Sequence, residues 1–390
     1  MSIWLALLVF LQLFILLHLL FPLLLMLLKV VRKKSVADLS KKTGIEADYA
    51  LIVTAYEQID LIPAVIESIL NVNYSNFIIY VVADNCDISS LKFDNEKVVI
   101  LRPEQTLASN IKSHLYAISH FKRQHERLTI IDSDNLVEPD YLTELNKVFD
   151  LGYQAVQGVR QAKNLNTNYA CLDAANDIYY RYVDKMLLTA AGSSSSLSGS
   201  GMAFNVSLYQ DCLNGMESSG AGFDKILQYE ILVRKYKIAF AANAIVYDEK
   251  TAKSQQLVKQ RARWLNTWFK FFKLGLRMFR TGALNLNLNQ FLFGSMLLRP
   301  PLFILLFLTL FFFVLDVLFL QTLAVILGVA AITFVIVFFS ALSYFKADKR
   351  IYKSLIDIPK FIFFQILALL SVRKANKISV ATRHEGYKSN

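Results

Sequence analysis

The chain has 390 residues, of which 55% are hydrophobic, and its formal net charge is +11. A soluble globular protein usually has about 45–50% hydrophobic residues, so this composition argues against an ordinary soluble enzyme. A strong positive charge is typical of proteins that bind nucleic acid or membranes, and because the basic residues flank apolar segments we expect a membrane. The three cysteines show neither the spacing of a metal site nor that of a disulfide framework, which is consistent with a reducing, cytosolic compartment.

The first predicted element is an apolar segment, Ile3–Leu28, which carries no formal charge. It is long enough to span a bilayer with some tilt. A signal peptide would begin with basic residues and have a shorter apolar region, so we interpret residues 1–34 as a transmembrane anchor. The positive-inside rule places the carboxyl end of this anchor in the cytoplasm, because the residues that follow the apolar segment include Lys29, Arg32, Lys33 and Lys34.

From about residue 48 onward, short apolar runs alternate with stretches of helical periodicity. This rhythm predicts an α/β domain with a parallel, doubly wound sheet over residues 48–258. The expected strands are Ala50–Thr54, Phe77–Ala83, Val98–Leu101, Leu128–Ile131, Ala155–Val159 and Ile238–Tyr247. The expected helices are Asp60–Asn71, Ile111–Phe121, Tyr169–Leu188 and Phe223–Lys237.

Acidic residues follow two of the predicted strands. Asp84 ends one strand, and Asp132 and Asp134 end another. Ligands of open α/β sheets bind beyond the carboxyl ends of the strands, so these acids are expected at one edge of the sheet. Paired carboxylates make an oxygen-rich site that suits Mg²⁺ or Mn²⁺ shared with phosphate oxygens. The alternative is that both sets are ordinary solvated turn residues, since Asp, Ser and Asn are common in turns.

A loop of small residues, Ala190–Gly201, leads into the apolar Met202–Phe204. The loop is either a flexible linker or a place where the backbone approaches a ligand closely. Both interpretations stay open from the residues alone.

The carboxyl-terminal part of the chain is again apolar. Residues 259–284 are dense in aromatic and basic side chains, which predicts amphipathic helices in the membrane interface. Such interleaving can also serve single-stranded nucleic acid, but the apolar segments on both sides argue against this, and no nucleic-acid partner is expected. Residues 288–346 are interpreted as two transmembrane helices. Residues 354–373 are interpreted as an interfacial or third transmembrane helix, followed by a basic cytosolic tail at 374–390.

Five motifs in order resemble the processive-type family 2 glycosyltransferases, the group that includes cellulose, chitin and hyaluronan synthases. They are Asp84, Asp132-Ser133-Asp134, the GSGMAF stretch Gly199–Phe204, Asp224, and a Gln-x-x-Arg-Trp motif at Gln260, Arg263 and Trp264. The resemblance implies a glycosyltransferase A-type (Rossmann-like) α/β cytosolic domain, with transmembrane and interfacial helices at both ends. One residue departs from the family, whose catalytic Asp usually follows a Glu, because Phe223 precedes Asp224 here.

The resemblance also implies a function for each motif. It implies inverting transfer of a sugar from a nucleotide sugar, most often a UDP-sugar, to a hydroxyl of a glycan or lipid-linked acceptor. The implied nucleotide-binding residues are Asp84, Asp132 and Arg263, and the implied ligands of Mg²⁺ or Mn²⁺ are Asp132 and Asp134. The implied catalytic base is Asp224, with Glu230 as the fallback. The implied acceptor-binding residues are Gly201, Met202, Gln260 and Trp264.

The expected location is an inner or plasma membrane, with several spans and a cytosolic catalytic domain. The expected partners are a nucleotide-sugar donor, a glycan or lipid-linked acceptor and membrane lipid. Three membrane spans are too few to form a wide channel for a growing polymer. If the product is a polymer, partner subunits are therefore expected to form the export channel. The alternative function is a catalytically degenerate, membrane-tethered nucleotide-sugar-binding subunit of a polysaccharide synthase complex, for which Phe223 is the main motive. A transporter is disfavoured because the spans are few.

Overall fold

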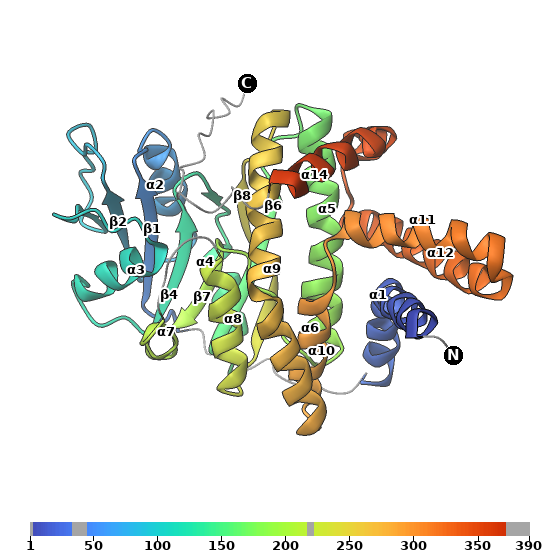
Figure 1. Cartoon of the computed structure of the whole chain (residues 1–390). Helices are drawn as coiled ribbons and strands as arrows, with labels where there is room; N and C mark the ends of the chain where they lie inside the picture. The colour runs from blue at the N-terminus through green and yellow to red at the C-terminus, as the bar shows by residue number, and fades with distance from the viewer. Residues whose placement is uncertain (1–2, 33–44, 217–221, 372–390) are drawn as a thin grey trace.

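The computed structural model describes residues 3–32, 45–216 and 222–371. The predicted tail at 374–390, and Lys33 and Lys34 of the predicted anchor, lie outside the described residues. An eight-stranded sheet forms one side of the molecule, and long apolar helices extend from the other (Figure 1).

The strands of the sheet have the order β3-β2-β1-β4-β7-β6-β8-β5. They are β1 Tyr49–Tyr56, β2 Phe77–Asp84, β3 Val98–Leu101, β4 Arg127–Asp132, β5 Leu136–Val137, β6 Ala155–Ala162, β7 Met202–Asn205 and β8 Ile238–Asp248. The six strands expected from the sequence are all present, and β5 and β7 are additional.

The expectation of a wholly parallel sheet is wrong, because β7 runs antiparallel to both β4 and β6, and β5 runs antiparallel to β8. The direction of β7 follows from where it starts. Ser200, just before β7, lies at the carboxyl end of β4, where its hydroxyl accepts a hydrogen bond from the Asp132 N–H at 3.1 Å. A strand that starts at this edge must run back across the sheet. The sheet is therefore mixed.

The helices and helical turns follow the strands in alternation through the first half of the chain. They are α1 Ile3–Val31, α2 Ile62–Leu70, α3 Asn110–Ser119, α4 Tyr141–Phe149, α5 Asn168–Tyr180, η1 Arg181–Leu187, α6 Leu188–Ala190, α7 Val206–Leu213, α8 Phe223–Val233, α9 Ser254–Leu284, α10 Leu288–Leu298, α11 Leu302–Phe319, α12 Gln321–Tyr344, α13 Lys349–Ser354, η2 Leu355–Asp357 and α14 Ile358–Ser371. The segment η1 is π-helical and joins α5 to α6 without a break. A π-helical insertion of this kind is rare and frequently marks a functional site.

The central strands are apolar because both of their faces are buried. Along β1, Ala50 and Ile52 belong to one hydrophobic cluster, while Leu51 and Val53 belong to a second cluster on the other face. This alternation is the period of a β-strand. The first cluster also contains Ile15 of α1, so the core of the sheet continues into the apolar helices.

Four helical segments among the described residues are long and apolar enough to cross a membrane: Leu7–Val31, Leu302–Phe319, Gln321–Tyr344 and Lys349–Ser371. Figure 1 shows α11 and α12 side by side, with α1 next to them. A hydrogen bond at 3.0 Å from Gln12 Nε2 to Asp316 Oδ1 joins α1 to α11. The segment Lys349–Ser371, which ends in α14, therefore qualifies as a third carboxyl-terminal span by its length and composition. Its last helix, α14, also packs on α9.

The region between the sheet and the spans differs from expectation in two ways. Residues 254–284 form one continuous helix of 31 residues, α9, instead of several shorter ones. The span α11 begins only at Leu302, because Pro300 and Pro301 separate it from α10. Proline has no N–H to donate and fixes its own φ, so it ends one helix and is tolerated at the start of the next. The shorter helix α10 packs back along α9.

Candidate active site

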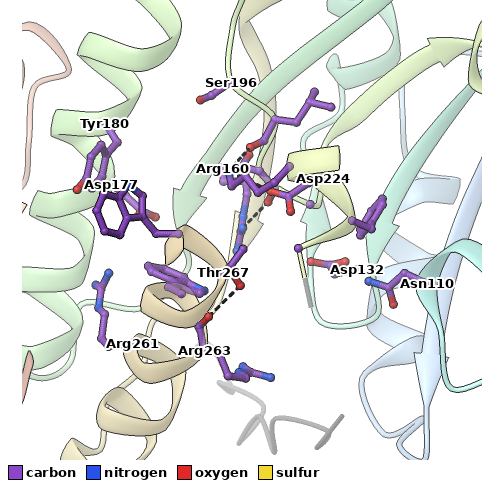
Figure 2. Close-up of a pocket in the computed structure, with 18 of the residues that line it drawn as sticks. Asn110, Asp132, Arg160, Asp177, Tyr180, Ser196, Asp224, Arg261, Arg263 and Thr267 are labelled. Carbon is purple, nitrogen blue, oxygen red and sulfur yellow. Dashed lines mark hydrogen bonds and ion pairs between the residues drawn. The ribbon is translucent and has the colours of Figure 1, made fainter. Parts of the chain in front are cut away.

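A cavity of about 770 Å³ opens between the carboxyl edge of the sheet and the helices α5, η1, α8 and α9. Figure 2 shows Asn110, Asp132 and Asp224 on one side of this cavity. It shows Asp177, Tyr180 and Arg261 on the other side.

Asp84 ends β2 and is 2% exposed. Its Oδ1 accepts a hydrogen bond from the Leu107 N–H at 2.9 Å, and its Oδ2 accepts one from the Ala108 N–H at 2.7 Å. Ala108 has a φ of +46°, in the left-handed region of backbone conformation that residues other than glycine rarely adopt. Asp84 thus lines the cavity and also fixes the turn that leads into α3.

Asp132 and Asp134 line the same cavity from the turn after β4. The strand register pairs Thr54 of β1 with Asp132, and Tyr56 of β1 with Asp84. All three acids therefore lie at one edge of the sheet, as the sequence predicts.

The two carboxylates after β4 suit a hard cation that keeps further oxygen ligands from water or phosphate. Within the described residues, no group of three or more His, Cys, Asp or Glu side chains is arranged to hold a metal by itself. A cation bound here would therefore need oxygen atoms from a ligand. Asp132 and Asp134 fit the shared metal that the sequence predicts.

Asp224 lies in the first turn of α8, and its side chain is 17% exposed and lines the cavity. Its Oδ2 is 3.2 Å from the Nζ of Lys225, which also donates a hydrogen bond to the Leu197 carbonyl at 3.3 Å. Gly222 precedes the helix with a φ of +96°, and a Cβ there would be 2.6 Å from Thr267 Cγ2 of α9. This close approach holds the start of α8 against α9 and directs Asp224 toward the cavity.

The fallback residue, Glu230, does not line this cavity. Its carboxylate forms an ion pair with Arg234, one turn further along α8, near the surface. The structure therefore brings Asp224 together with the strand-end acids and leaves Glu230 out.

The three residues of the Gln-x-x-Arg-Trp motif have different surroundings. Arg263 and Trp264 of α9 line the cavity, and burial lowers the pKa of the Arg263 guanidinium. Trp264 is 43% exposed, so its ring remains available to a ligand. Gln260 does not line the cavity, because its Oε1 accepts a hydrogen bond from the Thr251 hydroxyl at 3.2 Å. The acceptor contact expected of Gln260 is replaced by a link between α9 and the segment after β8.

Gly201 and Met202 were expected to contact the acceptor, but both lie behind the cavity wall. Met202 is fully buried in β7, and the Gly201 N–H donates to the Ile130 carbonyl at 2.9 Å. Glycine is favoured at position 201, because its φ of +66° is one that other residues rarely adopt, and a Cβ there would also be 3.1 Å from a methyl group of Val246. The part of this loop that does line the cavity is Ser196–Gly199.

Sequence reasoning missed an ionic network in the cavity wall, where Arg160 and Asp177 line the cavity. Arg160 Nη2 is 2.6 Å from Asp248 Oδ2, and Lys250 forms ion pairs with both Asp248 and Asp177. Burial alone would raise the pKa of Asp248, but Lys250 and Arg160 outweigh it and lower that pKa to about 2. The signal available in the sequence was one charged residue in each of two strands that have no other charge, Arg160 in β6 and Asp248 at the end of β8.

A buried lysine of η1 was also missed. Lys185 lines the cavity, and its Nζ donates to the Ser196 carbonyl at 2.6 Å. Burial, with a smaller contribution from the Lys225 charge, lowers the pKa of Lys185 to about 7. No local sequence pattern distinguishes this lysine from a surface residue.

Comparisons with known proteins agree with this arrangement. The family model described as glycosyltransferase like family 2 matches residues 47–267, which is more than half of the chain. A search of curated proteins finds no match.

Two solved structures illustrate the similarity of fold. The mannosyltransferase PcManGT from Pyrobaculum calidifontis, in complex with GDP-Man and Mn²⁺, is 14% identical with a TM-score of 0.57, covering 91% of this chain and 95% of its own. Residues 1–349 of TarS from S. aureus are 12% identical with a TM-score of 0.39, covering 64% of this chain and 90% of their own. The first of these supports the fold of the chain, and the second similarity is too low to carry an argument.

The match across residues 47–267 thus covers every strand of the sheet and all the strand-end acids of the cavity. The chain belongs to glycosyltransferase family 2, and it is a membrane-bound enzyme that transfers a glycosyl group from a nucleotide sugar.

Proposed function

We propose that this enzyme transfers a sugar from a UDP-sugar, with inversion, to a hydroxyl of a glycan or lipid-linked acceptor at the cytosolic face of the cell's inner or plasma membrane. The observation that carries the proposal is the convergence of Asp84, Asp132, Asp134 and Asp224 on one cavity, from three separate elements. The sheet topology alone brings Asp84 and Asp132 to one edge, but Asp224 comes from α8 and reaches the same cavity independently of the strand register. This convergence favours an active enzyme over a degenerate nucleotide-sugar-binding subunit.

The donor would lie along the edge of the sheet. Asp84 and the backbone that it fixes would contact the nucleoside, and Arg263 would bind the diphosphate, because a guanidinium can donate two parallel hydrogen bonds to phosphate oxygens. Asp132 and Asp134 would hold a divalent cation, Mg²⁺ or Mn²⁺, against the same diphosphate. A bound cation supplies charge stabilisation for the departing nucleotide. The cation-containing complex of the mannosyltransferase supports the use of a divalent metal.

Asp224 would act as the general base. The acceptor oxygen would attack the anomeric carbon from the face opposite the diphosphate, and the Asp224 carboxylate would take the hydroxyl proton. The bond between the anomeric carbon and the phosphate oxygen would break, so the nucleoside diphosphate would leave with the bonding electrons. Phe223 in place of the family's Glu does not displace Asp224 from the cavity wall. Trp264 would present its ring to the acceptor.

The cytosolic orientation rests on the basic residues at the ends of the apolar helices, such as Lys29, Lys346 and Lys349. Single cysteines in place of Ser35 and Ser389 would report it, because the three native cysteines are buried. Labelling in sealed vesicles should find both positions on the cytosolic side. Opposite sidedness would show that the segment Lys349–Ser371 crosses the membrane.

The experiment that tests the proposed function is a donor screen with the purified full-length chain in lipid nanodiscs. Released nucleoside diphosphate would be measured for a panel of UDP-sugars, with GDP-sugars alongside, in the presence and absence of Mg²⁺ or Mn²⁺. Turnover of one UDP-sugar that requires the cation is expected. Use of a GDP-sugar alone would refute the assignment of the nucleotide, and tight binding without turnover of any donor would favour the non-catalytic subunit.

A further inference from the structure

The catalytic cavity continues from the sheet edge to the apolar helices. The lining at this second end comes from the end of α10, the two prolines that follow it, the start of α11 and the middle of α14. It comprises Met296, Leu297, Pro300, Pro301, Leu302, Phe303 and Gln365. Leu302 is the first residue of α11, which is long and apolar enough to cross a membrane. The cavity therefore reaches the level at which a membrane-crossing helix begins, and we call this part its membrane end.

Two arginines at the membrane end are already neutralised by acids of the chain itself. Arg299 Nη2 is 2.5 Å from Asp184 Oδ2, and Arg261 forms an ion pair with Asp173. All four side chains are buried. Each of these ion pairs is neutral overall, so an anionic head group would meet no uncompensated positive charge at either arginine, and breaking a buried ion pair is costly. Among the described residues, Arg299 Nη1 and Arg261 Nε have no hydrogen-bond partner, and these N–H donors suit an uncharged hydroxyl group.

The buried lysine of the cavity lies toward the donor end instead. The Lys185 ammonium donates to the Ser196 carbonyl, on the loop that leads to the sheet edge at Ser200. A second lysine, Lys225, contacts the proposed base Asp224. These two charges are therefore placed to act on the donor and on the reacting groups.

Three uncharged polar groups lie near the membrane end: the amides of Asn176 and Gln365, and the hydroxyl of Tyr180, which accepts a hydrogen bond from the Leu302 N–H at 3.4 Å. The charged neighbours on α5 and η1 are already engaged, because Asp177 pairs with Lys250 and Arg181 donates to the Arg160 carbonyl. Amide groups both donate and accept hydrogen bonds, and the Tyr180 hydroxyl retains its proton to donate, which matches the hydroxyl groups of a sugar or of glycerol. The rings of Trp264 and Trp268 line the cavity nearby on α9 and offer apolar surface to such a group.

Outside the membrane end, large apolar side chains are exposed. Phe307 on α11 is 58% exposed and Phe363 on α14 is 56% exposed. Exposed apolar surface on this scale marks contact with a membrane or a partner. Here it lies on two helices that also supply cavity-lining residues, namely Leu302 and Gln365. An apolar chain that left the cavity between these helices would enter the bilayer.

We propose that the acceptor is an uncharged membrane amphiphile, whose hydroxyl-bearing head group occupies the membrane end of the cavity and whose apolar chain extends past Leu302 into the bilayer. This inference rests on the proposed function and narrows its acceptor class. The acceptor hydroxyl oxygen bonds to the anomeric carbon as the carbon–oxygen bond to the diphosphate breaks. The hydroxyl proton passes to Asp224 and the nucleoside diphosphate leaves, so the product is a neutral glycolipid.

The test uses the full-length chain in phosphatidylcholine nanodiscs and the nucleotide sugar identified in the donor screen. Three acceptors are compared: diacylglycerol as the uncharged amphiphile, a polyprenyl phosphate as the anionic one, and a water-soluble oligosaccharide. Glycosylated product and released nucleotide are both measured. Leu302→Trp narrows the membrane end, while Phe307→Trp makes a similar change one to two turns along the same helix, on its exposed face.

Transfer to diacylglycerol well above the other two acceptors is expected. Leu302→Trp should raise the KM for that lipid at least about tenfold, a typical effect of changing an apolar pocket, and should change the KM for the donor much less. Phe307→Trp should match the natural enzyme. Preferred use of the polyprenyl phosphate or the oligosaccharide, or equal kinetics for both variants, would overturn the acceptor assignment. Nucleotide release without transfer to lipid would also overturn it while leaving donor use intact, whereas failure with every donor would count against the proposed function itself.

Discussion

Replacing Asp224 by Asn removes the proposed general base and little else. A positioned base contributes about 10²–10⁴-fold to a rate, which corresponds to about 3–5 kcal/mol of activation free energy. The ion pair that Asp224 would lose, with Lys225 at 3.2 Å, is partly exposed to solvent. Such a pair contributes at most about 1 kcal/mol to the free energy of unfolding. The variant should therefore fold, bind donor normally and transfer sugar at least about a hundredfold more slowly.

Glu230→Gln is the matched control, because it makes the same carboxylate-to-amide change on the same helix. The Glu230 carboxylate pairs with Arg234, which directly follows α8. A pair of this type contributes about 0.3–0.5 kcal/mol to the free energy of unfolding, and Glu230 does not line the cavity, so the rate of transfer should stay within about twofold of the natural enzyme. Single-turnover transfer of a radiolabelled sugar measures the chemical step, and calorimetric titration with the donor measures binding. The reasoning would be refuted by a Glu230→Gln variant slower than Asp224→Asn, or by an Asp224→Asn variant of nearly full activity.

Three further variants test other parts of the site. Asp134→Asn should nearly abolish transfer and weaken the dependence on Mg²⁺ or Mn²⁺, since an amide lacks the charge that holds a hard cation; an unchanged metal titration would contradict the assignment. Asp84→Asn leaves an amide nitrogen facing one of two backbone N–H donors, which costs the folded turn about 1–3 kcal/mol; distorting this turn beside the proposed nucleoside site should lower donor affinity, and an unchanged Kd would place the donor elsewhere. Burial lowers the pKa of Lys185 from 10.5 to about 7, so the unfolded chain binds more protons than the folded protein between these values and the free energy of unfolding should rise with pH across that window. Lys185→Met should lose this rise in thermal denaturation from about pH 6 to about pH 9, and a variant with the same pH dependence would show that another group is responsible.

The parts of the fold that local pattern controls could be predicted from the sequence. Apolar runs such as Phe77–Ala83 form strands because both faces of the sheet are covered, and the helical periodicity of Asp60–Asn71 corresponds to α2. The direction of β7 could not be predicted, because a strand of four residues carries no signal for its orientation. That direction is set by where the preceding loop crosses the edge of the sheet.

The candidate site likewise contains residues that could be predicted from local sequence and residues that could not. Residues at strand ends, such as Asp84 and Asp132, could be placed together because parallel strands end at one edge. Lys185 and Arg299 could not, because each reaches the cavity only through the packing of η1 or α10 against elements far away in the sequence. Met202 was expected in the cavity lining because the family motif extends over the whole stretch Gly199–Phe204. In the structure only Gly199 of that stretch lines the cavity.

The pairing of α1 with α11 has a consequence for how the protein is made. Gln12 and Asp316 are 304 positions apart, which a ribosome covers in about 15–60 s at 5–20 residues per second. Throughout that time α1 lacks its final neighbours, and Ile15 and Leu19 lack the cluster that they share with the sheet and α12. The insertion machinery must therefore keep α1 in the bilayer while the catalytic domain emerges, and folding finishes only when the last helices arrive. Deleting those helices would leave the nascent enzyme at this unfinished stage.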